Sequence, residues 1–351
     1  MSFKKILAAA LCLSLFFVAG CNTEKDTSSI PNTSIPVSSD DVSSEEIIEP
    51  EFAINPLTGT EDLDPAFADK RPVAIMINNI SVAQSVQCGL SNADIIYETE
   101  VEQGITRLMA VFQNVSAVNQ IGTIRSARYA YIDLAMGHNA IYCHHGQDPA
   151  YAKPHLKHTT AFEIHENNAG KRLSNGKAKE HTLYTYGNKL WSVLSSSVKV
   201  ENKNSGTWQN FVGQEEVVNV AGGVANNVTI PFSRPQKTTF TYDVNTGKYL
   251  RYSNGVALAD YSTGAKVNVK NIFVLLTSIT NYSDGYHRNV NLSSGKGYYV
   301  TNGAYTEINW SKGNASSPIK FTNLDGTPLE VNAGKSYVAF MNKNTGSPSF
   351  N

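Results

Sequence analysis

The second half of the chain is a series of short runs of β-branched and aromatic residues, and this pattern limits the folds that it can adopt. The runs cover residues 238–243, 248–252, 266–282, 297–300, 305–310, 319–322, 329–332 and 337–340. Gly, Asn or Asp bounds each run, and Asn245-Thr246-Gly247 joins the first two as a hairpin turn. Such spacing favours strands joined by turns over helices. Residues 227–345 are therefore predicted to form a mainly antiparallel β domain.

Residues 52–205 combine strand patterns with helix patterns. Short apolar runs between turn formers predict strands at residues 72–79, 108–113 and 140–144, and an alternating pattern predicts another at 93–102. Ser126 is a suitable N-cap for a helix that starts at Ala127, and apolar side chains share one side of a second helix at 187–197. The mixture predicts an α/β (α+β) domain with a mixed sheet. The polar residues 206–226 are predicted to be the junction between the two domains.

The first 21 residues have the parts of a lipoprotein signal. Lys4 and Lys5 form a positively charged start, and the apolar run that follows, up to Val18, is too short to span a bilayer comfortably. Val18-Ala19-Gly20-Cys21 then resembles the lipobox of bacterial lipoproteins. The resemblance implies removal of residues 1–20, a diacylglycerol thioether on Cys21 and further acylation by chains such as palmitate. Those chains are expected to anchor the protein at the outer face of the bacterial cytoplasmic membrane.

Residues 21–51 have the composition of a tether rather than of a folded segment. After the lipidated cysteine they are rich in Ser, Thr and Pro, and they carry eight acidic residues against the single Lys25. This composition buries too little apolar surface to offset the loss of chain entropy on folding. As a flexible coil the tether would reach about 30 Å, enough to hold a domain away from lipid headgroups.

The overall charge excludes one class of partner. The chain has 29 basic and 30 acidic residues, and the basic residues form no stripe. A nucleic-acid partner is not expected, because such proteins present clustered positive charge to the phosphates. The expected partners are the membrane, through the N-terminal lipid, and a cell-wall polymer, peptide or protein outside the cell.

Two arginines three residues apart, Arg125 and Arg128, mark the candidate site. Arg128 falls in the first turn of the predicted helix, where the positive end of the helix dipole disfavours a cation. The pair therefore predicts an anionic partner, either a ligand or a nearby carboxylate. The other candidate residues near it in sequence are Arg107, Ser126, His144 and the carboxylates Asp94, Glu98, Glu100 and Glu102. A strand would direct the three glutamates to one face, because they share one parity.

Several segments carry a family resemblance. They are Asn55-Pro56-Leu57-Thr58-Gly59, Arg71-Pro72, Gly89 to Glu98, Gly104-Ile105-Thr106-Arg107, Ile121 to Arg128, His181-Thr182-Leu183-Tyr184-Thr185, Gly295-Lys296-Gly297, Ile308-Asn309-Trp310 and Leu324-Asp325-Gly326. These segments resemble the YerB-like bacterial lipoproteins, which have paired N- and C-terminal domains of unknown function. The resemblance covers roughly residues 55–342 and adds His181 to the candidate ligand-binding residues. It implies fold and location, and it brings no established activity. Cys143, His145 and Glu180 depart from the family pattern.

The residues leave three kinds of site open. In the first, the arginines bind an anionic ligand, with His144 at its edge, or they form an internal network with Asp94, Glu98 and Glu102. In the second, Glu98 or Glu102 is the acid or base of an envelope hydrolase, assisted by His144. No Gly-x-Ser-x-Gly or His-Glu-x-x-His motif supports the second kind. Binding or scaffolding in the cell envelope is the preferred function.

The third kind is a metal site, since six of the eight histidines lie close together in sequence. They are His138, His144, His145, His155, His158 and His165. The cluster has no standard ligand spacing, so neither a metal nor another cofactor is expected. Cys88 and Cys143 remain after lipidation, and either a disulfide or inert core thiols are compatible with an extracytoplasmic location.

Overall fold

The computed structural model describes residues 52–202 and 206–351, so the predicted lipidation site Cys21 and the predicted tether lie outside the described residues. The described residues belong to one compact unit. Of the described residues, 41% lie in strands or isolated bridges and 13% in helices. This confirms the predicted class, a mixed-sheet N-terminal region followed by a mainly antiparallel β region.

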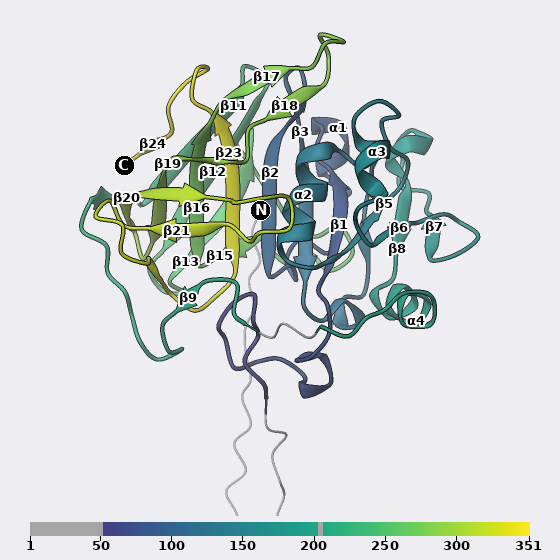
Figure 1. Ribbon diagram of the computed structural model, residues 1–351, viewed down its shortest axis with the longest axis horizontal. Helices are drawn as coiled ribbons and strands as arrows, with labels where there is room; N and C mark the ends of the chain where they lie inside the picture. Colours follow the sequence, from purple (N-terminus) through teal and green to yellow (C-terminus); the bar gives the residue numbers. More distant parts are fainter. Residues whose placement is uncertain (1–51, 203–205) are drawn as a thin grey trace, which may run out of the picture. The chain divides into compact units, whose positions relative to one another are not determined.

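The largest sheet has eleven strands and runs through both halves of the chain (Figure 1). In spatial order its strands are β10 (Gly223–Val224), β20 (Ala304–Ser311), β19 (Ser294–Thr301), β16 (Asn271–Thr277), β23 (Ser336–Asn342), β2 (Ile95–Glu102), β3 (Ile105–Phe112), β1 (Val73–Asn78), β5 (Ile141–His144) and β6 (Ala161–Glu163), with β21 (Lys320–Thr322) beside β20. The halves meet where β2 pairs with β23 in parallel, with Ile95 opposite Ser336 and Thr99 opposite Phe340. The two regions distinguished by sequence pattern therefore share one sheet.

Smaller sheets and short helices complete the fold. A six-stranded sheet contains β14 (Val256–Ala257), β13 (Lys248–Ser253), β12 (Gln236–Asp243), β11 (Asn227–Ser233) and β24 (Ser349–Phe350), with β15 (Asn268–Val269) beside β13. The remaining strands are β4 (Ile121–Gly122), β8 (Leu183–Thr185) and β7 (Gly170–Arg172) in one sheet, β17 (Ile279–Asn281) with β18 (Arg288–Val290), and β22 (Glu330–Val331) with β9 (Asn210–Phe211). The helices are α1 (Ser81–Gln84), α2 (Tyr129–Gly137), α3 (Ala152–Leu156) and α4 (Gly187–Ser197), and the 3-10 turns are η1 (Pro65–Phe67), η2 (Val115–Ala117) and η3 (Lys179–His181). Strands β9 and β10 come from the predicted junction.

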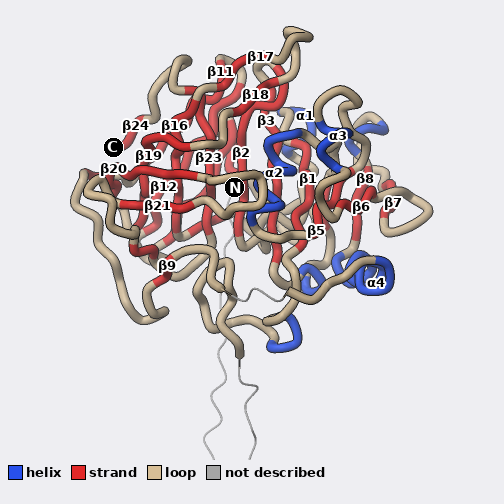
Figure 2. Tube along the Cα trace, viewed as in Figure 1, coloured by secondary structure: helices blue, strands red, loops and turns tan. Residues whose placement is uncertain are grey.

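Alternating side chains of the large sheet contribute to two apolar cores, one on each face. On β1, for example, Ile75 belongs to the first core and Met76 to the second. The six-stranded sheet covers the first core with side chains such as Phe240, whereas α2 covers the second with side chains such as Ile132. Figure 2 shows α2 in front of the strands of the large sheet. Because both faces are covered, central strands such as β1 and β16 are nearly continuous apolar runs, which explains why they are recognisable in the sequence.

Most of the predicted elements are present, and one boundary is wrong. The four N-terminal strands, the β12–β13 hairpin and the helix at 187–197 lie where the patterns place them. The helix expected from Ala127 instead begins at Tyr129, and Ser126 is not its N-cap. The backbone N–H of Ala127 donates to the carbonyl of Gly146 at 2.9 Å, and Arg107 donates to the carbonyl of Ser126 at 2.8 Å. These tertiary bonds hold the two residues outside the helix.

The carboxylate of Glu98 joins the two halves of the chain in the interior. One oxygen accepts hydrogen bonds from Asn79 and Thr106, each at 2.7 Å. The other accepts from Thr238 at 2.7 Å and from the hydroxyl of Tyr337. The guanidinium of Arg251 lies 3.7 Å from the same oxygen, and both charged side chains are fully buried. A buried charge of this kind is tolerable only because it is paired and hydrogen-bonded on all sides.

Removing this carboxylate should therefore destabilise the whole molecule. We expect Glu98→Ala to lower the free energy of unfolding by about 3–5 kcal/mol, because it leaves the buried guanidinium of Arg251 without a counter-charge. Urea denaturation followed by circular dichroism measures the change. Glu307→Ala, at an exposed position of β20, is the matched control and should change stability by less than about 0.5 kcal/mol. Equal stability of the two variants would contradict this account of the core.

Candidate functional site at the carboxyl edge of the sheet

Four strands of the large sheet end at the same edge, which we call the carboxyl edge. Strands β1, β5 and β6 are parallel neighbours. Strand β2 has the same direction, because both β1 and β2 are antiparallel to β3. Glu102 ends β2, His144 ends β5 and Glu163 ends β6. In open α/β sheets, ligands bind beyond the carboxyl ends of the strands, where the chain turns away and leaves side chains exposed.

One carboxylate and three arginines meet at this edge, and we call Glu102, Arg107, Arg125 and Arg128 the arginine cluster. Arg107 lies 3.2 Å from Oε1 of Glu102, and Arg128 is ion-paired with the same oxygen. Arg128 also donates to the carbonyl of Ala127 at 2.8 Å, whereas its Nε–H is buried without a hydrogen-bond partner. Three of the residues predicted as a site are thus in direct contact.

The charges in the arginine cluster do not balance locally. Burial works to raise the pKa of Glu102, but the guanidinium groups of Arg107 and Arg128 outweigh it and lower the pKa on balance. Burial lowers the pKa of Arg107 to about 9, with repulsion from Arg128 adding to the shift. A single negative charge therefore faces several positive charges, and an anion is the natural complement of this arrangement.

Arg125 is the member of the arginine cluster that makes no close ion pair, although Glu102 and Glu180 attract it electrostatically. Its backbone N–H donates to the carbonyl of Met76 at 3.0 Å, and its carbonyl accepts from the N–H of His145 at 3.0 Å. These bonds fix Arg125 between the ends of β1 and β5. Its guanidinium donates to the carbonyl of Glu180 at 3.2 Å, and no described carboxylate forms an ion pair with it. Burial lowers the pKa of Arg125 as well.

Gly146 connects the strand ends to the arginine segment. Its carbonyl accepts from the N–H of Ala127 and from Nδ1 of His144, each at 2.9 Å, and its own N–H donates to Glu163 at 2.9 Å. A φ of +75° makes this geometry possible, and a Cβ here would lie 3.1 Å from the hydroxyl oxygen of Ser126. Because the carbonyl accepts from Nδ1 of His144, that nitrogen carries the proton and Nε2 has the lone pair. Burial lowers the pKa of His144, so the ring is neutral at pH 7.

His181 lies near Arg125 and is anchored from β1. Asn78 donates from Nδ2 to Nδ1 of His181 at 2.8 Å, since the Oδ1 of Asn78 accepts from the N–H of Ile80. The ring is buried, and burial lowers the pKa of His181, with the neighbouring Glu180 opposing the shift and Arg125 adding to it. The structure thus brings His144 and His181 to the same edge as the arginine cluster.

The other predicted carboxylates lie elsewhere. Asp94 precedes β2 at the opposite edge, where it accepts from Asn55 at 3.0 Å and from the N–H of Gln113 at 2.7 Å. Glu98 is buried against Arg251, and Glu100 pairs with Arg288 at 2.9 Å. The β2–β3 register shifts between Glu100 and Glu102, which interrupts the alternation expected of a regular strand. The predicted network of Asp94, Glu98 and Glu102 with one set of arginines is therefore divided among separate partners.

Some partners of the site residues have no signal in the local sequence. Arg251 and Arg288 come from more than 150 residues further along the chain, and no local pattern connects them to the glutamates. Glu163, by contrast, lies two residues before His165 on a strand end, and this spacing is a usable signal. Cys88 and Cys143 are both buried free thiols. Of the two interpretations of Cys143, the inert core thiol agrees with the structure, since burial raises the pKa of its thiol.

Comparisons with known proteins agree on one relationship. Residues 57–199 match the N-terminal domain of the family described as "Protein of unknown function (DUF3048)", and residues 228–338 match its C-terminal domain. YerB of Bacillus subtilis (strain 168), which is named as a lipoprotein, is 29% identical over 347 residues, covering 95% of this chain and 94% of YerB. The crystal structure of YerB superposes with a TM-score of 0.72 at 27% identity, covering 85% of this chain and 99% of the crystallised chain. Within the described residues, no helix has the length and apolarity to cross a membrane.

The charge of Glu102 predicts a pH dependence of stability. The folded pKa of Glu102 lies below its ordinary value of 4.5. The ionised group therefore stabilises the protein fully above about pH 4.5, and this contribution is lost as the pH falls through the lower folded pKa. We expect Glu102→Gln to lower the free energy of unfolding by about 2 kcal/mol at pH 7, because it weakens the charge-assisted bonds to Arg107 and Arg128, and by progressively less below about pH 4. Chemical denaturation of both proteins between about pH 3 and 7 measures the difference, and a difference that stays constant would show that the charge is not stabilising.

Proposed function

Because the chain belongs to the DUF3048 family of YerB-like lipoproteins, whose two domains have no known function, we propose its role from the carboxyl edge itself. The protein binds a phosphate or carboxylate group of an anionic envelope polymer or peptide. It does so at the outer face of the cytoplasmic membrane, where the lipid predicted on Cys21 holds it. A binding or scaffolding protein of the cell envelope, rather than an enzyme, is the function that the geometry supports best.

The observation that carries this proposal is the excess of positive charge in the arginine cluster. Glu102 alone pairs with Arg107 and Arg128, and Arg125 has only a backbone carbonyl as its hydrogen-bond acceptor among the described residues. Guanidinium groups that are partly withdrawn from water bind oxyanions strongly, because the competing hydration is weakened. A phosphate or carboxylate would also supply the acceptor that the buried Nε–H of Arg128 lacks.

The backbone supports the same role. Arg125 and Arg128 stand at the two ends of a four-residue segment that is bonded to the ends of β1 and β5. Their positions are thus set by the sheet rather than by a free loop, so little conformational entropy is lost on binding. Ser126 lies between them and is half-buried, with its hydroxyl near Gly146. Neutral His144 and His181 complete the edge without adding charge.

The hydrolase alternative has less support from the geometry. Glu98 is fully buried beneath residues of both halves of the chain, so an external polymer has no access to its carboxylate. Glu102 is held in ionised form by two guanidinium groups, which makes it a weak base and a poor proton donor at neutral pH. Glu102 thus lacks the environment that raises a carboxyl pKa towards neutrality, as a general acid requires.

Equilibrium binding tests the proposal. The protein from Glu49 onward suits the measurement, because the crystallised YerB chain corresponds to most of this unit. A glycerol-phosphate oligomer and a peptide rich in free carboxylates, each titrated by calorimetry at low and high salt, distinguish the two sources of negative charge. We expect Arg125→Ala to weaken binding by about 2 kcal/mol, or roughly 30-fold in Kd, since it removes a charge-assisted bond. Added salt should weaken binding to the unmodified protein as well.

A matched control separates the site from general charge effects. Arg234 is exposed and lies outside the arginine cluster, so Arg234→Ala removes the same charge without touching the site. Binding by the control should equal that of the unmodified protein. Equal weakening by Arg125→Ala and Arg234→Ala, or no binding of either ligand, would overturn the proposal.

A further inference from the structure

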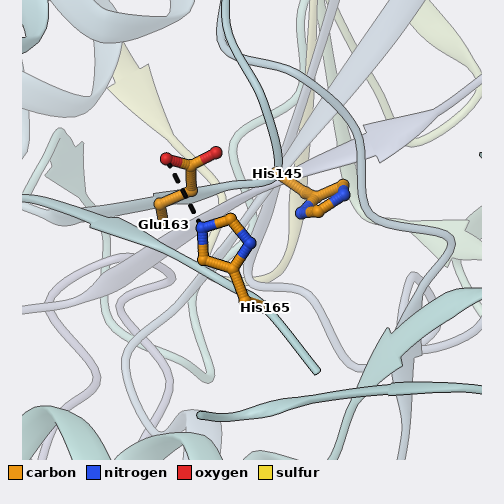
Figure 3. Close-up of side chains that lie close together, drawn as sticks. All are labelled: His145, Glu163 and His165. Atoms are coloured by element: carbon orange, nitrogen blue, oxygen red, sulfur yellow. Dashed lines mark ion pairs between the residues drawn. The ribbon is translucent and has the colours of Figure 1, made fainter. Parts of the chain in front are cut away.

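A second group of side chains lies next to the arginine cluster, at the ends of β5 and β6. The imidazoles of His145 and His165 and the carboxylate of Glu163 each offer one atom, and these atoms all lie within 4.8 Å of one another. Figure 3 shows the two rings and the carboxylate gathered around a common space. From this arrangement we infer that His145, Glu163 and His165 form a binding site for a divalent transition-metal ion of the Zn²⁺ type.

The backbone places the three residues together. His144 lies opposite Glu163 in the parallel β5–β6 pair, so His145 follows directly at the same level of the sheet. Glu163 and His165 are two residues apart. Asn168 fixes the segment between them, because its side chain accepts from the N–H of His165 at 2.8 Å and donates to the carbonyl of Glu163 at 3.0 Å. The site therefore depends on strand pairing as well as on a local turn.

Hydrogen bonds set the ligand atoms. Nδ1 of His145 lies 2.7 Å from the carbonyl of Ile164, which can only accept, so Nδ1 carries the proton and Nε2 keeps its lone pair. Metal-binding histidines commonly donate their second N–H to a carbonyl in this way, because it fixes both tautomer and ring orientation. Glu163 accepts from the N–H of Gly146 through Oε1, while its Oε2 lies 3.6 Å from Nε2 of His165.

The types of ligand atom indicate which metal ion the site would bind. Two imidazole nitrogens and one carboxylate oxygen match a common three-residue zinc ligand set, which leaves a fourth coordination position for water or another ligand. Imidazole favours Zn²⁺ and its neighbours in the first transition series over Mg²⁺ or Ca²⁺. The side chains of His165 and Glu163 are 46% and 34% exposed, so an ion can enter from solvent.

Arg172 would compete with a metal ion for the Nε2 atom of His145. Its Nη2 lies 3.3 Å from Nε2 of His145, and its other nitrogens contact Glu166 at 3.2 Å and the carbonyl of Lys179 at 2.7 Å. A metal ion would take the lone pair of His145 from this guanidinium, and the two positive charges would repel each other. Arg172 therefore lowers the affinity, and its removal should raise it. If His165 and Glu163 formed only a structural ion pair, the removal of Arg172 would not raise the affinity for a metal ion.

Titration with Zn²⁺ tests the inference. We expect calorimetry of the metal-free protein to give one Zn²⁺ per chain. His165→Ala and Glu163→Gln should each weaken binding about tenfold or more, whereas Arg172→Ala should strengthen it. His158→Ala, an exposed histidine outside the site, is the matched control and should leave the affinity unchanged. Co²⁺ gives an independent optical readout, because its visible absorption reports a low-coordinate nitrogen and oxygen environment.

Zinc binding that persists in both His165→Ala and Glu163→Gln would overturn the inference. Equal loss of binding in His158→Ala, or the absence of Zn²⁺ binding to the unmodified protein, would overturn it too. Thermal denaturation confirms that each variant is folded, and His165→Ala should stay folded because the side chain of His165 is exposed. No anionic polymer enters the experiment, so its result is independent of the function proposed for the arginine cluster.

Discussion

The buried carboxylate of Glu98 is the interaction on which the rest of the structure depends. Glu98 lies on β2, the strand through which the N-terminal half of the large sheet pairs with the C-terminal half. Three of its partners, Thr238, Arg251 and Tyr337, come from the C-terminal half. An apolar interface would join the two regions with less directional preference, whereas a charge that must be satisfied from several sides specifies one arrangement. The β2–β23 pairing, and thus the alignment of the strand ends, is consistent with this requirement.

That alignment creates the functional surface. Four strands with the same direction end together, and their last residues bring Glu102, His144 and Glu163 to one edge. The arginine cluster and the proposed metal site are neighbours because backbone hydrogen bonds join the segment 125–128 to the loop after β5. The N–H of His145 donates to the carbonyl of Arg125, and the N–H of Ala127 donates to the carbonyl of Gly146. Clustered guanidinium groups on one side and two imidazoles with a carboxylate on the other give the edge two different chemistries. The resemblance to YerB extends over this whole unit, yet a shared fold leaves the role of the edge to its own residues.

Much of the fold could be predicted, because the signals were local. Central strands such as β1 were apolar runs between turn formers, and α4 had a clear apolar side. The start of α2 was missed, because two tertiary hydrogen bonds override the capping preference of Ser126. Arg107 donates to the carbonyl of Ser126, and the N–H of Ala127 donates to the carbonyl of Gly146. The site was anticipated in part: Glu102, Arg107 and Arg128 do meet, and they are close in sequence. Glu98 and Glu100 instead pair with arginines that lie far along the chain, and a register shift separates Glu100 from Glu102. Residue spacing reveals neither feature.

The sequence by itself determined the family, the class of fold, the short-range elements and the arginine-rich segment, because each rests on residue types or periodicities that act over a few positions. Only the tertiary structure decided that both regions share one sheet, which glutamate pairs with which arginine, and that His145, Glu163 and His165 share one space. The reason is physical. Strand pairing and burial join residues that are distant in the chain, and the energy of a charge depends on the partners and the solvent that the finished fold leaves around it.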